Sequence, residues 1–140
     1  MLNSVSLVRS ILGPTRCSIL PLAYAMDITA KRIFIDRIPE DDLKLCDDVC
    51  YEVAKRLNKP ITPKSVTRSV ERCANRCRDE LVKSGRTREY LGKPMNYIEN
   101  PRKMVIYLAT LMYFEKPYFQ MIAEQPEMFT GKDPAGLLPR

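Results

Sequence analysis

The clearest hydrophobic pattern in this chain is a pair of apolar stripes near its middle. The first stripe has an apolar residue at every third or fourth position: Leu43, Cys46, Cys50, Val53 and Leu57. The second stripe has similar spacing: Val66, Val70, Cys73, Cys77 and Leu81. Such spacing places each set on one face of an α-helix. Residues 58–63 contain two prolines, which break a helix, and Gly85 favours a helix end. The sequence predicts an all-α fold built on an antiparallel helical hairpin.

Each stripe carries one C-x3-C pair, and the two pairs define the predicted site. A separation of four residues places both sulfurs of a pair on the same helix face, one turn apart. Antiparallel packing then brings Cys46 opposite Cys77 and Cys50 opposite Cys73. We therefore expect two disulfides that staple the hairpin, because a hairpin of this size buries too little apolar surface to be stable alone.

Two other interpretations of these four cysteines stay open. They could all bind one zinc ion, although structural zinc more often uses C-x2-C turns. They could also remain reduced and act as small apolar core residues. Four cysteines permit three pairings, and a bond within one helix would constrain almost nothing. A catalytic thiol pair is less favoured, because such pairs usually have closer spacing and an exposed disulfide. We expect no metal and no cofactor.

Residues 69–81, with the sequence SVERCANRCRDEL, and residues 45–50, with the sequence LCDDVC, resemble the two halves of the small Tim family. The resemblance covers residues 40–92. It implies a twin C-x3-C hairpin in the mitochondrial intermembrane space, where relatives form rings that shield hydrophobic precursors. The segment between the motifs is longer than in small Tims, and both ends of the chain are extended.

The first 26 residues have the composition of a mitochondrial presequence. They contain no acidic residue, two arginines and four serines, and Leu2, Val5, Val8 and Leu12 recur at helical spacing. We interpret residues 1–26 as a basic N-terminal extension, either retained or cleaved, and residues 27–39 as a linker. Cys17 lies in the extension, and we predict that it is unpaired.

The segment after the hairpin is predicted to be an apolar helical extension, residues 93–125, followed by an extended tail, residues 126–140. Asn100 and Pro101 suit the start of a helix, and Thr110 is the one clearly polar residue within 104–114. That stretch is too short to span a bilayer. A helix apolar on all sides must be covered, so we predict a partner-binding surface at Met104, Tyr107, Leu108, Leu111, Met112, Phe114, Tyr118 and Phe119. A membrane surface or the chain's own core could cover it instead.

Charge and composition exclude several function classes. The chain has 140 residues, a formal net charge of +6 and no histidine, and it shows no nucleophile–base arrangement or glycine-rich phosphate loop. We therefore predict that it is not an enzyme. Basic and acidic residues interleave along the second stripe without an aromatic stacking platform. This favours a solvated helix face over nucleic-acid binding.

Two functions of different class follow from these observations. The first is a non-catalytic accessory subunit of a respiratory-chain or ATP synthase assembly, on the intermembrane-space side of the inner membrane. The second is a soluble small Tim-type chaperone acting in a hetero-oligomeric ring. The expected partners are accordingly subunits of an inner-membrane complex or small Tim paralogues.

Overall fold

A computed structural model describes residues 2–131 of the chain, and every regular element in that range is helical. The α-helices are α1 (Ser4–Leu12), α2 (Leu20–Ala30), α3 (Tyr51–Arg56), α4 (Pro63–Ser84), α5 (Thr87–Leu91), α6 (Pro101–Phe114) and α7 (Tyr118–Glu124). Two π-helical turns, η1 (Lys31–Ile35) and η3 (Leu45–Cys50), and two 3-10 turns, η2 (Glu40–Asp42) and η4 (Pro126–Phe129), complete the fold. The predicted all-α class is confirmed for these residues. Of the predicted tail, residues 132–140 lie outside the described part.

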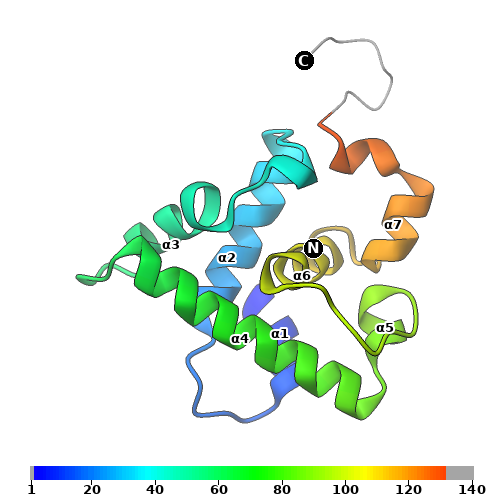
Figure 1. Ribbon diagram of the computed structural model, residues 1–140, viewed down its shortest axis with the longest axis horizontal. Coiled ribbons are helices and arrows are strands. Elements are labelled where there is room, and N and C mark those ends of the chain that lie inside the picture. Colours follow the sequence, from blue (N-terminus) through cyan, green and yellow to red (C-terminus); the bar gives the residue numbers. More distant parts are fainter. Residues whose placement is uncertain (1, 132–140) are drawn as a thin grey trace.

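The core forms around α2 and α6, which pack closely against each other (Figure 1). Helix α2 is apolar on nearly all sides, and Leu22, Ala23, Ala25 and Met26 are fully buried. It also contacts α1, α3 and α4. A helix of this composition has to be covered all round, and the neighbouring helices cover it. The segment predicted as an N-terminal extension and linker therefore supplies the middle of the core.

The predicted second helix of the hairpin is present as α4, and its ends follow local sequence signals. The Thr62 hydroxyl accepts a hydrogen bond from the Ser65 amide at 3.2 Å, and Pro63 occupies the first turn. At the other end Gly85 adopts a left-handed conformation with φ of 69°. The apolar stripe of α4 faces the core, while the opposite side follows the outside of the molecule (Figure 1).

The predicted first helix of the hairpin is shorter and less regular than predicted: η2 is separated from it by the non-helical residues 43–44, and the π-helical turn η3 then continues directly into α3. Arg32 Nε donates to the Asp48 carbonyl oxygen at 3.0 Å, and the Asp48 carboxylate accepts from the Lys44 amide at 2.7 Å. When a side chain hydrogen-bonds to a backbone carbonyl oxygen of a helix, it disturbs the regular pattern of backbone hydrogen bonds. The wider π-helical turn also changes which residues share a face, so Cys46 is half-buried while Cys50 is fully buried.

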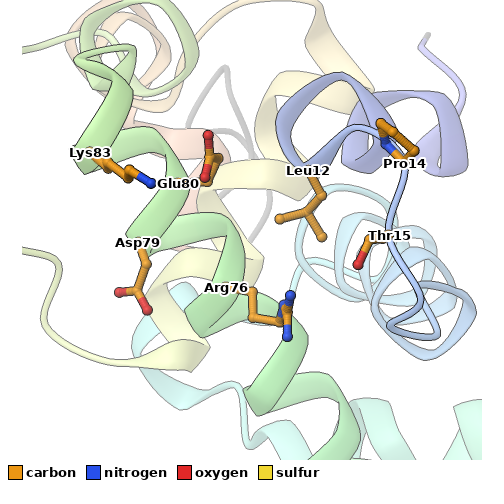
Figure 2. Close-up of a pocket in the computed structure, with 7 residues that line it drawn as sticks. All are labelled: Leu12, Pro14, Thr15, Arg76, Asp79, Glu80 and Lys83. Carbon is orange, nitrogen blue, oxygen red and sulfur yellow. The ribbon is translucent and has the colours of Figure 1, made fainter.

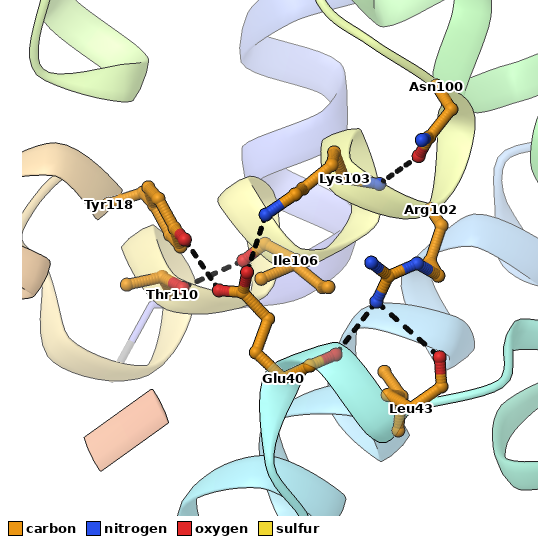
Figure 3. Close-up of polar contacts among 8 residues, drawn as sticks. All are labelled: Glu40, Leu43, Asn100, Arg102, Lys103, Ile106, Thr110 and Tyr118. Carbon is orange, nitrogen blue, oxygen red and sulfur yellow. Dashed lines mark hydrogen bonds and ion pairs between the residues drawn. The ribbon is translucent and has the colours of Figure 1, made fainter. Parts of the chain in front are cut away.

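A buried polar network joins η2 to α6 and α7 (Figure 3). Glu40 accepts a hydrogen bond from the Tyr118 hydroxyl at 2.6 Å and forms an ion pair with Lys103 Nζ at 2.5 Å. Arg102 donates to the Glu40 carbonyl oxygen at 2.8 Å. Asn100 caps α6 by accepting from the Lys103 amide at 2.9 Å, as the sequence predicts. The network fixes the start of the buried helix α6.

Aromatic packing closes the C-terminal part of the fold. The ring of Phe34 lies 4.7 Å from that of Phe114 and 5.4 Å from that of Phe129. Tyr118 packs against Phe129 at 5.2 Å. Residues 126–129, predicted to be extended chain, form the short turn η4, because the buried Phe129 ring holds them against the core. None of the described helices is long and apolar enough to cross a membrane.

Candidate functional site

The exposed face of α4 carries a row of four cations. Lys64, Arg68, Arg72 and Arg76 lie four residues apart, and all four are exposed. Side chains at this spacing are neighbours on a helix surface, one turn apart. Each step of four residues also rotates by about 40°, so the row slants gently around α4. We call these four residues the basic row.

The charges of the basic row are not neutralised by other described residues. None of its four side chains forms a hydrogen bond or an ion pair with any residue in 2–131. The one acidic residue of α4 before Asp79 is Glu71, which is half-buried. Like charges one turn apart repel each other, so the row destabilises the isolated helix slightly. An anionic ligand would relieve that repulsion.

The turn before α4 extends the positive surface. Arg56 at the end of α3 and Lys59 in the connection, residues 57–62, are exposed. The helix N-terminus, with its partial positive charge, adds to the same region. Tyr51 on α3 is exposed, and the Lys55 ammonium lies 4.9 Å from its ring centroid. The region therefore presents mainly positive charge.

Two carboxylates mark the other end of the basic row. Asp79 and Glu80 follow Arg76, and they line a groove of about 450 Å³ with Arg76, Lys83 and the α1–α2 loop (Figure 2). Arg78 is paired with Asp79 at 2.9 Å. Charges alternate here, whereas the first part of α4 is almost uniformly positive. The anion-binding potential is thus confined to the N-terminal two thirds of α4.

All five cysteines are free in the structure, so the predicted disulfides Cys46–Cys77 and Cys50–Cys73 are not confirmed. The elements that carry the two pairs, η3 and α4, do pack against each other. Cys50, however, lies beside Thr67 and Glu71, about one turn before Cys73. The π-helical turn explains this shifted register. Cys73 has Cys77 and Cys17 as its cysteine neighbours instead.

Burial and mutual contacts change the acidity of these thiols. Burial raises the pKa of Cys50 to about 11, against a smaller opposing effect of a hydrogen bond with Thr67. Hydrogen bonding from Cys77 lowers the pKa of Cys73, with further lowering from Cys17 and Arg76, while burial opposes these effects. The pKa of Cys77 is strongly raised by its hydrogen bond to Cys73 and by burial. Within residues 2–131 no group of three or more potential metal ligands is arranged to hold an ion.

The predicted partner-binding residues lie in the interior of the chain. Five of them are buried: Met104, Tyr107, Leu108, Met112 and Tyr118. The other three are partly buried and pack against the same core: Leu111, Phe114 and Phe119. The intramolecular core, one of the covers left open by the sequence, is therefore what surrounds this stretch. The protein's own α2 covers much of it, so these side chains form no exposed apolar face.

The basic row does have a signal in the sequence, which lies in the spacing of its charges. Along the chain, basic and acidic residues of 64–80 interleave, a pattern that favours an ordinary solvated face. When the helix is built, the cations at steps of four residues gather on one side, and Glu71, Asp79 and Glu80 fall at its edge or beyond its end. The periodicity of charge, rather than its order along the chain, identifies the row.

Comparisons of the chain with family models, curated proteins and solved structures found no match.

Proposed function

We propose that this protein binds double-stranded DNA through the basic row of α4. The observation that carries the proposal is the set of four exposed cations on one helix face without carboxylate partners among the described residues. Surface lysines and arginines are commonly interspersed with acids, whereas unbalanced clusters of cations are typical of nucleic-acid binding. The formal net charge of +6 acts in the same direction by attracting polyanions.

The dimensions of the basic row suit a DNA duplex. Its first and last Cα atoms, those of Lys64 and Arg76, are separated by 12 residues, or about 18 Å along the helix axis. The major groove of B-form DNA is wide enough for an α-helix, and phosphates flank it on both sides. Helix α4 is preceded by the shorter helix α3 and a brief connection. Helix-turn-helix proteins present their second helix to the major groove in a comparable order.

Two other nucleic acids are less suitable ligands for this surface. Single-stranded binding usually requires aromatic platforms on which bases stack. The two exposed tyrosines lie beyond the two ends of the basic row: Tyr51 is on α3 with Lys55 beside its ring, and Tyr97 lies near Arg78 and Val82. The major groove of duplex RNA is too deep and narrow for side chains to read. Duplex DNA therefore fits the charge and the shape of α4 best.

The proposal can be tested by fluorescence anisotropy with a labelled DNA duplex of mixed sequence and a salt titration from about 50 to 200 mM. We expect binding that weakens as salt rises. In the variant Arg68→Gln/Arg72→Gln, two phosphate contacts are lost, so the slope of log K against log salt should become shallower by about two. Affinity at the lowest salt should fall by roughly tenfold or more.

The matched control is Arg9→Gln/Arg88→Gln, which removes two exposed cations outside the basic row and has the same net charge. It should keep the wild-type slope. Equal losses in both variants would mean that binding follows net charge alone. Absence of any binding at low salt, or preference for single strands, would contradict the proposal directly.

A second candidate is the small Tim-like function, as an accessory subunit of an inner-membrane assembly or as an import chaperone in the intermembrane space. One specific observation favours it, namely that the elements carrying the two C-x3-C pairs pack against each other. Its test is the native size of the endogenous protein in mild detergent. Co-migration with an inner-membrane complex would support the subunit, and a small ring with paralogues would support the chaperone.

A further inference from the structure

A groove of about 290 Å³ lies against the buried polar network of Glu40, Lys103 and Tyr118. All three residues line it, and Figure 3 shows how their side chains converge. Glu40 and Tyr118 are buried, and the hydrogen bond between them measures 2.6 Å. Side chains held in this way cannot move without breaking the network. This wall of the groove is therefore fixed in place before any ligand arrives.

Lys103 provides the positive charge of the groove. Its ammonium has three N–H groups, and the one acceptor that it reaches among residues 2–131 is the Glu40 carboxylate at 2.5 Å. Its side chain lines the groove and is 17% exposed. Arg102 donates to the Glu40 carbonyl oxygen at 2.8 Å, so a second cation lies on the same side. A carboxylate in the groove would accept a charge-assisted hydrogen bond from Lys103.

Asp41 provides the available negative charge. It follows Glu40 in η2, is exposed and lines the groove. Its carboxylate forms no ion pair with any residue in 2–131. The two carboxylates of Glu40 and Asp41 balance the two cations of Lys103 and Arg102. A ligand that carries both charges but no net charge therefore matches this region best.

The opposite wall of the groove is largely apolar. It is formed by Ile122 of α7 and by Pro126 and Phe129 of η4. Phe129 is buried and packs against Tyr118, whereas Ile122 is partly buried and Pro126 is exposed. Pockets for drug-sized ligands begin at about 300 Å³, so this groove suits a ligand near the small end of that range.

We infer that the groove binds a free apolar amino acid such as leucine. The α-ammonium pairs with Asp41, the α-carboxylate accepts from Lys103, and the aliphatic side chain packs against Ile122 and Pro126. A single amino acid carries both charges on one carbon, whereas a peptide carries them at its two ends. No residue of α4 is among the described residues that line the groove, so this inference is independent of DNA binding.

The test is an NMR titration of the full, ¹⁵N-labelled chain with L-leucine. We expect saturable shifts of the backbone amides of residues 40–41, 122 and 127–130, and no shifts in α4. Leucinamide lacks the carboxylate and 4-methylpentanoate lacks the ammonium, so each should bind at least about tenfold more weakly than leucine. These analogues test the contribution of Lys103 without disturbing its ion pair with Glu40.

Two neighbouring variants provide a matched comparison. Asp41→Asn removes the carboxylate that lines the groove and should weaken leucine binding by at least about tenfold. Asp42→Asn changes the net charge equally at an exposed residue that does not line the groove, and it should leave the affinity unchanged. Unchanged thermal melts would show that both variants are folded. Equal weakening in both variants, an analogue that binds as tightly as leucine, or the absence of saturable shifts would overturn the inference.

Discussion

Helices α4 and α6 are the two longest in the described chain, and they use their surfaces in opposite ways. Helix α6 is apolar on nearly all sides, and residues 104–110 are all buried. Other parts of the fold therefore cover its apolar surface. Helix α4 buries one stripe and leaves a row of unneutralised cations facing solvent. An apolar surface that the chain already covers has no need of a partner. A row of cations without carboxylate partners in the chain, in contrast, favours the binding of an external anionic ligand.

The largest expected effect comes from shortening a side chain in the middle of α6. Leu108 is fully buried in the core, so Leu108→Ala removes apolar contacts and leaves a cavity. We expect the free energy of unfolding to fall by about 2–5 kcal/mol in urea denaturation. Arg72→Ala in the basic row is the counterpart and should change stability by less than about 0.5 kcal/mol. Comparable losses in both variants would erase the distinction between the two helices.

The second test concerns the ion pair that fixes the start of α6. Glu40 accepts from Tyr118 at 2.6 Å and pairs with Lys103 at 2.5 Å, and both Glu40 and Tyr118 are buried. Burial, together with the Glu40 carboxylate, raises the pKa of Tyr118, so its hydroxyl stays protonated as a donor. In Glu40→Gln the single amide oxygen can accept from either the Tyr118 hydroxyl or the Lys103 ammonium. The amide nitrogen, itself a donor, then faces the remaining donor.

We expect Glu40→Gln to lower the free energy of unfolding by roughly 1.5–3 kcal/mol. The neighbouring substitution Asp41→Asn changes an exposed carboxylate and should have little effect. The two variants can be compared by denaturation in urea at neutral pH. A neutral result for Glu40→Gln would show that the network contributes geometry to α6 and no net stability.

The sequence predicts α4 and the start of α6 because their signals are local. A capping hydroxyl at Thr62, a left-handed glycine at position 85 and the Asn100 side chain act within one turn of the residues they cap. The π-helical geometry of η3 was not predictable in the same way. It depends on Arg32, which lies 16 positions before Asp48 in the sequence. The Arg32 side chain donates a hydrogen bond to the backbone carbonyl oxygen of Asp48.

The cover of α6 could not be predicted for a related reason. The hairpin alone is too small to enclose an apolar helix, and the segment that forms α2 has a composition that is equally typical of a presequence. Composition cannot distinguish the start of a core helix from part of a targeting segment here, since residues 20–26 of α2 are apolar and contain no acidic residue. The basic row, in contrast, is detectable from spacing alone.

The smallest expected effect lies where the core meets the charged surface of α3. Asp27 on α2 is half-buried, and burial raises its pKa above the ordinary value of 3.8, against the lowering effects of a hydrogen bond from Ser4 and the charge of Arg56. A raised carboxyl pKa means that the folded state binds more protons than the unfolded state. The contribution of Asp27 to stability is therefore full below pH 3.8 and is lost as pH rises through its folded pKa.

Asp27→Asn should flatten this dependence, by less than about 1 kcal/mol because the site is partly exposed to solvent. Ser4→Ala should act in the opposite direction, since it removes the hydrogen bond that lowers the pKa of Asp27, and so should steepen the loss of stability with rising pH. Urea denaturation at several pH values measures both slopes. If Ser4→Ala shifted the slope in the same direction as Asp27→Asn, the Ser4 hydrogen bond could not be lowering the pKa of Asp27. Substituting Arg72 should leave the slope unchanged, because Arg72 is exposed on α4 and is not among the groups that shift the pKa of Asp27.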